Sequence, residues 1–368
     1  MQVNWSFKRM ITSSALALLV TSSAYAIPRG PCEEAPKTVC CEEPKPGPFA
    51  FSYPKDMNLA CPSDFYFRAD MLAMQPKQDG LEYAVLNQND SNNLNAGIVQ
   101  GFSTQQHDWD WGFGFRLGMG FYLNHDAWTV DTQWTWFRIS EDVSSAAQHD
   151  GNFVPQWLVG DDIIPSRGNA HSSARWQMKM NVFDLTIGKP YHVSRYLVLN
   201  PFFGLRGAWI DQDFSARYGG LFTSPSSVNG SQMDAENDWW GVGTRMGVNT
   251  EWNLGGGWQL LANMNASMLY GKVDVKQSAP LGSDTYSIRH EFYRDSPNME
   301  LQVGAAWGSY FNDMKHYVKV QAMWEFHQWW DQNWMRKLYS GSPSWVNDTV
   351  SRGDLSMSGA SVRVSFEF

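Results

Sequence analysis

The stretch WDWGFGFRLGMGFYL, residues 109–123, alternates strictly between large apolar side chains and polar or small ones. Successive side chains of a β-strand point to opposite faces, so the pattern predicts one strand with one apolar face. The ten steps from Trp111 to Phe121 give ~33 Å of strand, which at ~40° of tilt covers the ~25 Å apolar band of an outer membrane. The stretch is therefore typical of a strand that crosses a lipid bilayer.

Further segments with the same alternation follow, separated by turn-forming residues. With residues 109–123, the expected strands lie near residues 64–74, 128–136, 175–188, 197–209, 240–252, 258–270, 299–307, 318–326 and 361–368. In residues 175–188 the apolar parity switches near Val182 and Phe183, which predicts a β-bulge. After residue 26 the sequence offers no run of 18 consecutive apolar residues, so it predicts no membrane-spanning helix.

The connections between these segments alternate in length. Short ones lie at residues 124–126, 189–194, 253–256 and 312–315, and long ones at 75–107, 140–174, 212–237, 273–296 and 329–355. Outer-membrane barrels have short periplasmic turns and longer extracellular loops. The expected fold is all-β: an antiparallel transmembrane β-barrel of the bacterial outer membrane, with about 10–12 strands, over residues 63–368. The upper count allows for a further hairpin in a long loop, for example over residues 80–86.

The last residues, SVRVSFEF, also alternate, with Val364, Phe366 and Phe368 on one face. A barrel must pair its last strand with its first, because an open edge in lipid leaves backbone groups without hydrogen bonds. The strand at residues 361–368 is therefore expected to lie against the strand near Phe65. Val364, Phe366 and Phe368 resemble the C-terminal signal by which the outer-membrane assembly machinery recognises its substrates.

The first residues have the features of a secretory signal. Lys8 and Arg9 precede an apolar stretch at residues 15–20, which is followed by Ala24, Tyr25 and Ala26. A basic region, a short apolar region and an A-x-A site are typical of a cleaved signal peptide. We therefore expect residues 1–26 to be removed on export. The alternative is a membrane anchor, but the apolar stretch is far shorter than the ~20 residues of a spanning helix.

Residues 27–62 hold 8 of the 17 prolines and all four cysteines, which predicts an extended periplasmic segment. Cys32, Cys40, Cys41 and Cys61 are disulfide candidates in an oxidising compartment. Four cysteines allow three complete pairings, and the sequence leaves the choice open. Their spacing lacks the C-x₂-C pattern of a zinc site, and we expect neither a metal nor a cofactor.

The side chains at the polar positions of each alternating strand are expected to face the lumen. The candidate pore-lining residues are Arg116, Asp131, Arg206, Arg245, Glu251, Glu300, Lys319, Glu325 and Arg363. They could line an open pore and set the electric field that passing solutes experience. Alternatively, they could form ion pairs with one another and fill a narrow barrel. Inward glycines such as Gly118 and Gly120 fit either arrangement, since they leave room for a pore or for large neighbours.

Two stretches carry a more specific likeness, DFYFRADMLAMQPKQDGLEYAV at residues 64–85 and DLTIGKPYHVSRYLVLNPFFGLRGAWID at residues 184–211. Both resemble the major outer membrane protein-like (MOMP-like) pore-forming proteins of chlamydiae and legionellae. The resemblance implies an outer-membrane porin for ions and small solutes, with disulfide cross-linking that contributes to envelope integrity. The barrel region has no cysteine, so only the N-terminal segment could take part in that cross-linking. The alternative is a structural or adhesive surface barrel with a side-chain-filled lumen.

Other classes of function find little support. The sequence contains no G-x-S-x-G, H-E-x-x-H or Walker-type motif, so an enzyme is not expected. The net charge is −9 and no basic stripe points to nucleic acid. The expected partners are the outer-membrane lipid bilayer, the assembly machinery, further copies of the chain, and disulfide-linked envelope proteins.

Overall fold

The computed structural model describes the following part of the chain: residues 65–87, 97–100, 111–123, 128–146, 152–157, 163–164, 171–194, 196–219, 221–223, 226–228, 231–281, 284–312, 315–342, 345–350 and 352–368. The regular elements in this part are β-strands. In the described residues, no helix is long and apolar enough to cross a membrane.

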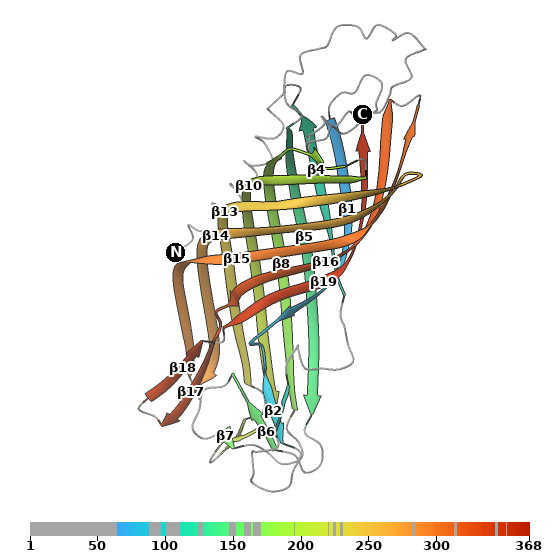
Figure 1. Cartoon of the computed structure of the whole chain (residues 1–368). Helices are drawn as coiled ribbons and strands as arrows, with labels where there is room; N and C mark the ends of the chain where they lie inside the picture. Colours follow the sequence, from blue (N-terminus) through green and yellow to red (C-terminus); the bar gives the residue numbers. More distant parts are fainter. Residues whose placement is uncertain are drawn as a thin grey trace, which may run out of the picture. The chain divides into compact units, whose positions relative to one another are not determined.

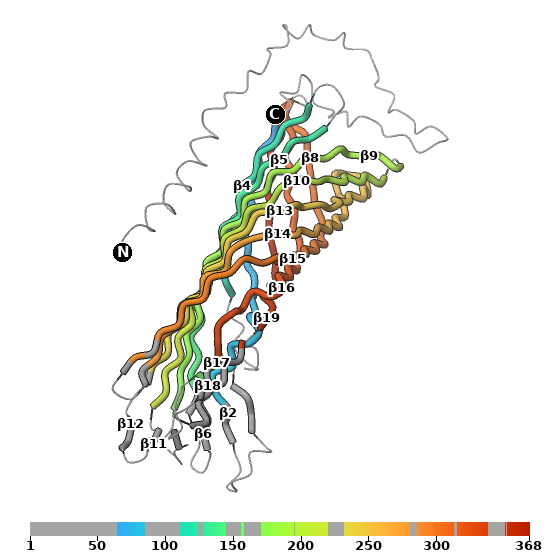
Figure 2. Tube along the Cα trace, turned by 90° about the vertical axis from the view of Figure 1, so that its left-hand side faces the viewer, coloured from blue at the N-terminus to red at the C-terminus, as the bar shows by residue number. Residues whose placement is uncertain are grey.

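Ten antiparallel strands form a closed barrel (Figure 1), which confirms the predicted fold class at the lower end of the expected strand count. They are β1 (Phe65–Gln78), β4 (Gly112–Tyr122), β5 (Thr129–Ala146), β8 (His171–Gly188), β10 (Leu197–Gly219), β13 (Ser231–Gly255), β14 (Trp258–Leu281), β15 (Asp284–Phe311), β16 (His316–Asn333) and β19 (Gly353–Glu367). The last strand pairs with the first, with Phe366 opposite Phe67, as the closure argument predicts. The short turns and the C-terminus lie at one end, together with β9 (Tyr191–His192), as Figure 2 shows; by the usual arrangement this end is periplasmic.

The remaining strands are short and lie in the connections. β2 (Ala84–Asn87), β3 (Gly97–Gln100) and β6 (Asn152–Pro155) form one small sheet, β7 (Ile163–Ile164), β11 (Leu221–Thr223) and β12 (Ser226–Val228) form another, and β17 (Arg336–Ser342) pairs with β18 (Trp345–Val350). The extra hairpin expected near residues 80–86 is therefore not part of the barrel wall. Only its end forms a strand, β2, which belongs to a loop sheet.

The barrel consists of two layers with opposite polarity. In the membrane layer, outward side chains are apolar: Phe113, Leu117 and Met119 are 67%, 47% and 40% exposed. In the outer layer, the outward side chains are polar and the inward ones are apolar. The boundary runs close to Phe113, Trp136, Phe183, Trp209, Trp240, Tyr270 and Phe326. Each strand crosses from lipid to water at this boundary, so its apolar face changes sides.

This boundary accounts for the parity switch in β8. The predicted bulge near Val182 and Phe183 is wrong, because the register of β8 with β5 and β10 runs through both residues without a shift. Phe183 faces outward in the membrane layer, whereas Met178 and Met180 are buried inside the outer layer. The backbone alternates regularly throughout, and only the environment of its outward face changes.

Three of the predicted long loops, residues 212–237, 273–296 and 329–355, are mostly strand, and in the first two most of that strand belongs to the barrel wall. Residues 212–237 hold the end of β10 and the start of β13, and residues 273–296 hold the end of β14 and the start of β15. The apolar side chains of these strand ends point into the barrel, for example those of Phe214, Met233 and Val275. A sequence search for strands with an outward apolar face therefore stops at the boundary of the membrane layer, although the hydrogen-bonded strands continue beyond it.

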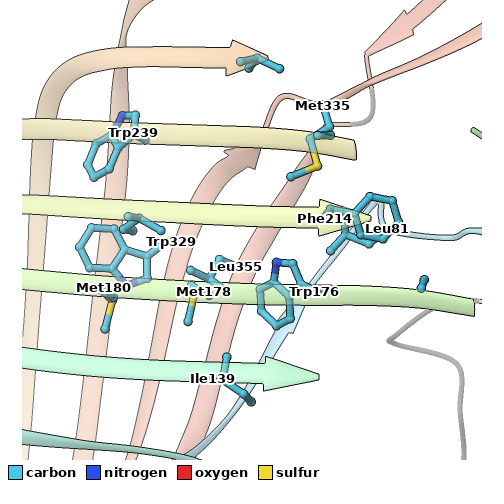
Figure 3. Close-up of a cluster of buried hydrophobic side chains, with 14 of the residues drawn as sticks. Leu81, Ile139, Trp176, Met178, Met180, Phe214, Trp239, Trp329, Met335 and Leu355 are labelled. Carbon is cyan, nitrogen blue, oxygen red and sulfur yellow. The ribbon is translucent and has the colours of Figure 1, made fainter. Parts of the chain in front are cut away.

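The interior of the outer layer is a hydrophobic core (Figure 3). Barrel residues such as Trp176, Phe214, Trp239 and Trp329 are at most 3% exposed there. Five residues from the connections pack into the same core. Besides Ala84 of β2 they are four large side chains, which we call the stopper: Leu81, Tyr83, Trp157 and Met335. Two hydrogen bonds to backbone carbonyls hold it, because the Trp157 ring N–H donates to Glu82 (2.7 Å) and the Tyr218 hydroxyl donates to Tyr83 (2.6 Å).

Candidate functional site

A belt of four arginines and four carboxylates crosses the lumen in the membrane layer. The charge belt consists of Asp70 (β1), Arg116 (β4), Asp184 (β8), Arg206 (β10), Arg245 (β13), Glu300 (β15), Glu325 (β16) and Arg363 (β19). Their side chains are at most 12% exposed. The other two barrel strands contribute uncharged partners, Thr135 of β5 to Arg116 and Asn265 of β14 to Arg245. Every strand of the barrel is thereby tied into one polar network.

One half of the belt is centred on Asp70. Its Oδ2 lies 2.7 Å from the Nη2 of Arg363 and 2.9 Å from the Nη1 of Arg116. The other terminal nitrogen of Arg116 lies 3.0 Å from Glu325 Oε2. The Ser361 hydroxyl also donates to Glu325. A carboxylate between two guanidinium groups fixes both, so this half holds β1, β4, β16 and β19 together across the barrel closure.

The other half is centred on Asp184, which lies 2.7 Å from Arg206 and 2.6 Å from Arg245. Glu300 also contacts both arginines, Arg245 at 3.2 Å and Arg206 through a second ion pair. His327 joins the two halves, since its Nε2 lies 2.9 Å from Glu325 and its Nδ1 lies 3.5 Å from Glu300. The belt is therefore continuous across the lumen.

The belt is electrically balanced, with four formal positive and four formal negative charges apart from His327. A charge placed in a buried site is strongly destabilising unless it is paired and hydrogen-bonded. Here Asp70 and Asp184 each neutralise two arginines in part, and the remaining positive charge faces Glu300 and Glu325. At this level the lumen is filled by paired side chains, which is the second of the two arrangements that the sequence left open.

Six of the nine candidate pore-lining residues lie in the belt: Arg116, Arg206, Arg245, Glu300, Glu325 and Arg363. The other three lie in two separate ion pairs. Asp131 accepts hydrogen bonds from Arg68 and from the Tyr66 hydroxyl, and Glu251 lies 2.9 Å from Lys319. Whether any of the nine contacts a passing solute stays a prediction.

The sequence candidates omitted several interior polar residues, among them Tyr66, Arg68, Asp70 and Asp184. The alternation in residues 64–74 would have found the first three, because they lie at the even positions between Phe65, Phe67, Ala69 and Met71. Asp184 was hidden by the parity switch in β8, where the apolar residues on both sides made the inward face ambiguous.

A polar cavity of about 80 Å³ lies beside the belt. Its lining includes Arg68, Asp131, Arg245, Asn263 and Arg363. Two buried polar atoms of its lining, the Nε of Arg68 and the Oδ1 of Asn200, have no hydrogen-bond partner within the described residues. Buried polar groups are nearly always hydrogen-bonded, so the cavity is suited to water or a small polar solute.

The inward glycines make room for neighbouring side chains. A Cβ on Gly118 would lie 2.5 Å from Arg68 Nε, and a Cβ on Gly120 would lie 2.3 Å from the Tyr66 hydroxyl oxygen. These glycines let the long side chains of β1 lie flat across β4. They therefore contribute to a filled interior at these two positions.

The C-terminal aromatic residues gather at the periplasmic end. The Phe368 ring lies 6.0 Å from Phe67 and 4.6 Å from Phe366, and its backbone N–H donates to the Phe65 carbonyl at 3.3 Å. The residue thus completes the closure between β19 and β1. The predicted disulfide candidates Cys32, Cys40, Cys41 and Cys61 lie outside the described residues.

Comparison with known proteins places these features in context. A family model described as Legionella pneumophila major outer membrane protein precursor matches residues 60–368. A search of curated proteins finds no match.

Among solved structures, the outer membrane protease OmpT from Escherichia coli has a TM-score of 0.41 at 9% identity, over 84% of this chain and 97% of that one. The P. putida toluene transporter TodX has a TM-score of 0.29 at 11% identity, over 86% and 92%. The Ralstonia pickettii toluene transporter TbuX has a TM-score of 0.29 at 10% identity, over 88% and 97%. At these TM-scores and identities, we draw no conclusion about activity from the similarities.

Proposed function

Since this chain belongs to the Legionella pneumophila major outer membrane protein family, we propose that it is an outer-membrane porin whose lumen is closed at rest. Ions and small solutes would diffuse through it passively when the charge belt and the stopper separate. The chain is an outer-membrane β-barrel, and that part of its function needs no further proposal.

The observation that carries the proposal is the contrast between the two layers. In the outer layer this barrel fills its interior with Trp, Phe and Met side chains. In the membrane layer it holds eight charges and a polar cavity instead. Replacing a buried ion-pair network by apolar side chains is often neutral or stabilising, so stability alone does not require the charges. A polar interior is what passing ions need, and this supports the porin proposal.

A second candidate is a surface barrel with a permanently filled lumen. The outer core favours it, because the stopper residues Leu81, Tyr83, Trp157 and Met335 are at most 1% exposed. Under this proposal the barrel is a rigid support for extracellular contacts. Catalysis forms no part of either proposal.

Single-channel recording in planar bilayers tests the two candidates against each other. The variants are wild type, W157A, which shortens the stopper, and W240A as a lipid-facing control. The porin proposal expects discrete conductance steps in wild type and W240A, and more frequent or larger steps in W157A. Silence in all three inserted proteins would overturn the porin proposal and leave the filled barrel.

The N-terminal region completes the proposal. We propose that residues 1–26 are cleaved on export and that Cys32, Cys40, Cys41 and Cys61 form disulfides in the envelope. Disulfides in this segment could join copies of the chain or join it to other envelope proteins. A reducible ladder of high-mass species on non-reducing gels supports this, and its absence in protein prepared without reductant would contradict it.

A further inference from the structure

A row of amide side chains crosses four neighbouring strands on the inner face of the barrel. Asn200 of β10 lies opposite Asn249 of β13. Asn249 in turn lies opposite Asn263 of β14, which lies opposite Gln302 of β15. All four residues line the polar cavity beside the charge belt. Because every amide side chain carries both a donor and an acceptor, the row offers the cavity a continuous series of hydrogen-bonding groups.

Much of the hydrogen-bonding capacity of this lining is unused. Asn249 and Thr186 of β8 both line the cavity and are half-buried, and neither side chain forms a hydrogen bond to any residue that the structure describes. The Asn263 amide donates to the Gln302 side-chain oxygen at 3.1 Å. Within the described residues, the Asn263 oxygen and the Gln302 amide N–H groups then have no further partner. Polar groups inside a protein are nearly always hydrogen-bonded, so these groups require water or a solute.

The charged side chains around the cavity are already paired with one another. Arg68 is paired with Asp131, and Arg363 is paired with Asp70. Arg245 contacts two carboxylates of the charge belt. An anion that entered the cavity would meet these carboxylates, and a cation would meet the arginines. The lining is therefore suited to a solute without net charge.

We propose that this cavity binds a small uncharged polyol such as glycerol. Each hydroxyl group both donates and accepts, so hydroxyls match a row of amides, whereas an apolar solute would leave the amides without partners. The volume of about 80 Å³ holds roughly six waters at ~10–15 Å³ each, which is about the size of a three-carbon polyol. The carbon atoms of the polyol would lie against Phe202, which also lines the cavity.

The cavity lies between the charge belt and the periplasmic end of the barrel. Its lining includes Thr129, the first residue of β5, and Gly188, the last residue of β8. Asn200 lies near the start of β10, whereas the belt residue Arg206 lies further along that strand. A solute can therefore occupy the cavity without crossing the belt. The inference rests on the porin proposal for the passage of this solute, but the binding itself does not require the belt to separate.

Saturation-transfer-difference NMR of the full chain tests the proposal, with glycerol as the probe and a detergent that has no sugar or polyol headgroup. The test variant T186V/N249L replaces two polar side chains of the lining by apolar ones of similar shape. The control is T250V, because Thr250 follows Asn249 on β13 and lies on the outward face with Met246 and Trp252. We expect saturable glycerol binding by wild type and T250V. For T186V/N249L we expect an affinity at least about tenfold weaker, since two hydrogen bonds are together worth about that factor.

Acetate and methylammonium are measured on wild type in the same series, so that the comparison of solutes does not depend on any variant. Equal glycerol binding by T186V/N249L and wild type would overturn the proposal. Tighter binding of either ion than of glycerol would overturn it too, as would an equal loss in T250V. The measurement requires no conductance and therefore separates the two proposals. A conducting wild type that binds no glycerol would overturn this site alone, whereas glycerol binding by a wild type that is silent in bilayers would leave the site and overturn the porin proposal.

Discussion

The ring of Trp239 on β13 meets the ring of Trp329 on β16 edge to face, with centroids 6.1 Å apart and planes at 70°. The two strands are not neighbours, because β14 and β15 lie between them in the sheet. The contact therefore joins separate parts of the barrel wall through the interior of the outer layer. It shows directly that the outer layer has a packed core where an open pore would have a channel.

Replacing Trp239 by Ala should destabilise the barrel by about 3–5 kcal/mol, the usual cost of a large cavity in a packed core. The matched control is W240A, one residue along the same strand, where Trp240 faces outward and is 40% exposed. Urea unfolding of the detergent-folded barrel measures both. A loss in W240A as large as that in W239A would contradict the two-layer assignment.

Removing one carboxylate from the charge belt should leave a buried arginine poorly paired. We expect E325L to destabilise the barrel by about 3–5 kcal/mol, because Arg116 then keeps only Asp70 as a charged partner. The double variant R116M/E325L should recover much of this loss, since it removes both charges. The control is E236Q, because Glu236 and its partner Lys276 are both about half exposed and lie outside the belt. Equal unfolding midpoints for E325L and wild type would show that the belt pairs contribute nothing.

The stopper should respond to pH through Glu82, which lies 2.8 Å from Lys337 outside the membrane layer. Burial opposes ionisation of Glu82, but the hydrogen bond and charge of Lys337 outweigh it and hold the pKa of this carboxyl below its ordinary value. A lowered pKa stabilises the folded state above the unfolded pKa of about 4.3, and this contribution is lost as the pH falls through the folded pKa.

We therefore expect E82Q to be less stable than wild type at pH ~7 by up to about 1 kcal/mol, as for a partly exposed pair. As the pH falls through the lowered folded pKa of Glu82, the urea midpoints of the two proteins should converge, because the carboxyl becomes protonated in both states. The control E236Q breaks the more exposed pair with Lys276 and should change less. A gap between E82Q and wild type that persists at low pH would contradict the ion-pair explanation.

Deleting Phe368 should impair assembly while leaving export intact. The deletion removes the ring contacts with Phe67 and Phe366 and the hydrogen bond to Phe65 that complete the closure. Heat-modifiable gel mobility and membrane fractionation report the folded fraction. The control is F311A, which shortens an aromatic residue at the same end and leaves the C-terminus unchanged. A normal barrel yield without Phe368 would show that the terminal aromatic is dispensable.

Replacing Cys32, Cys40, Cys41 and Cys61 together by Ser should remove any reducible oligomers and preserve the barrel. The ladder from β1 to β19 closes the barrel without any cysteine, because all four precede Phe65. Circular dichroism and heat-modifiability measure the fold, and non-reducing gels measure the oligomers. Loss of the folded barrel in this variant would mean that the N-terminal segment is part of the fold.

The sequence by itself determined the membrane layer. Strict alternation in residues 109–123 and in the last eight residues fixed which side chains face lipid, and the need to close the ladder in lipid fixed the pairing of β19 with β1. The same parity placed Arg116, Arg206 and Arg245 in the interior. These features are local and periodic, so a single strand is enough to reveal them.

Only the tertiary structure decided what the interior does. Arg116 of β4 meets Glu325 of β16 although β1 and β19 lie between their strands, and Asp184 meets Arg245 from a strand two positions away in the barrel. The partner of a buried charge depends on which strands face each other across the lumen, and strand periodicity contains no such information. The sequence did not reveal the outer layer for a related reason. In the membrane layer the apolar positions of a strand face outward to lipid, whereas in the outer layer they face inward to the core. Trp239 therefore lies in the core, while Trp240 faces outward.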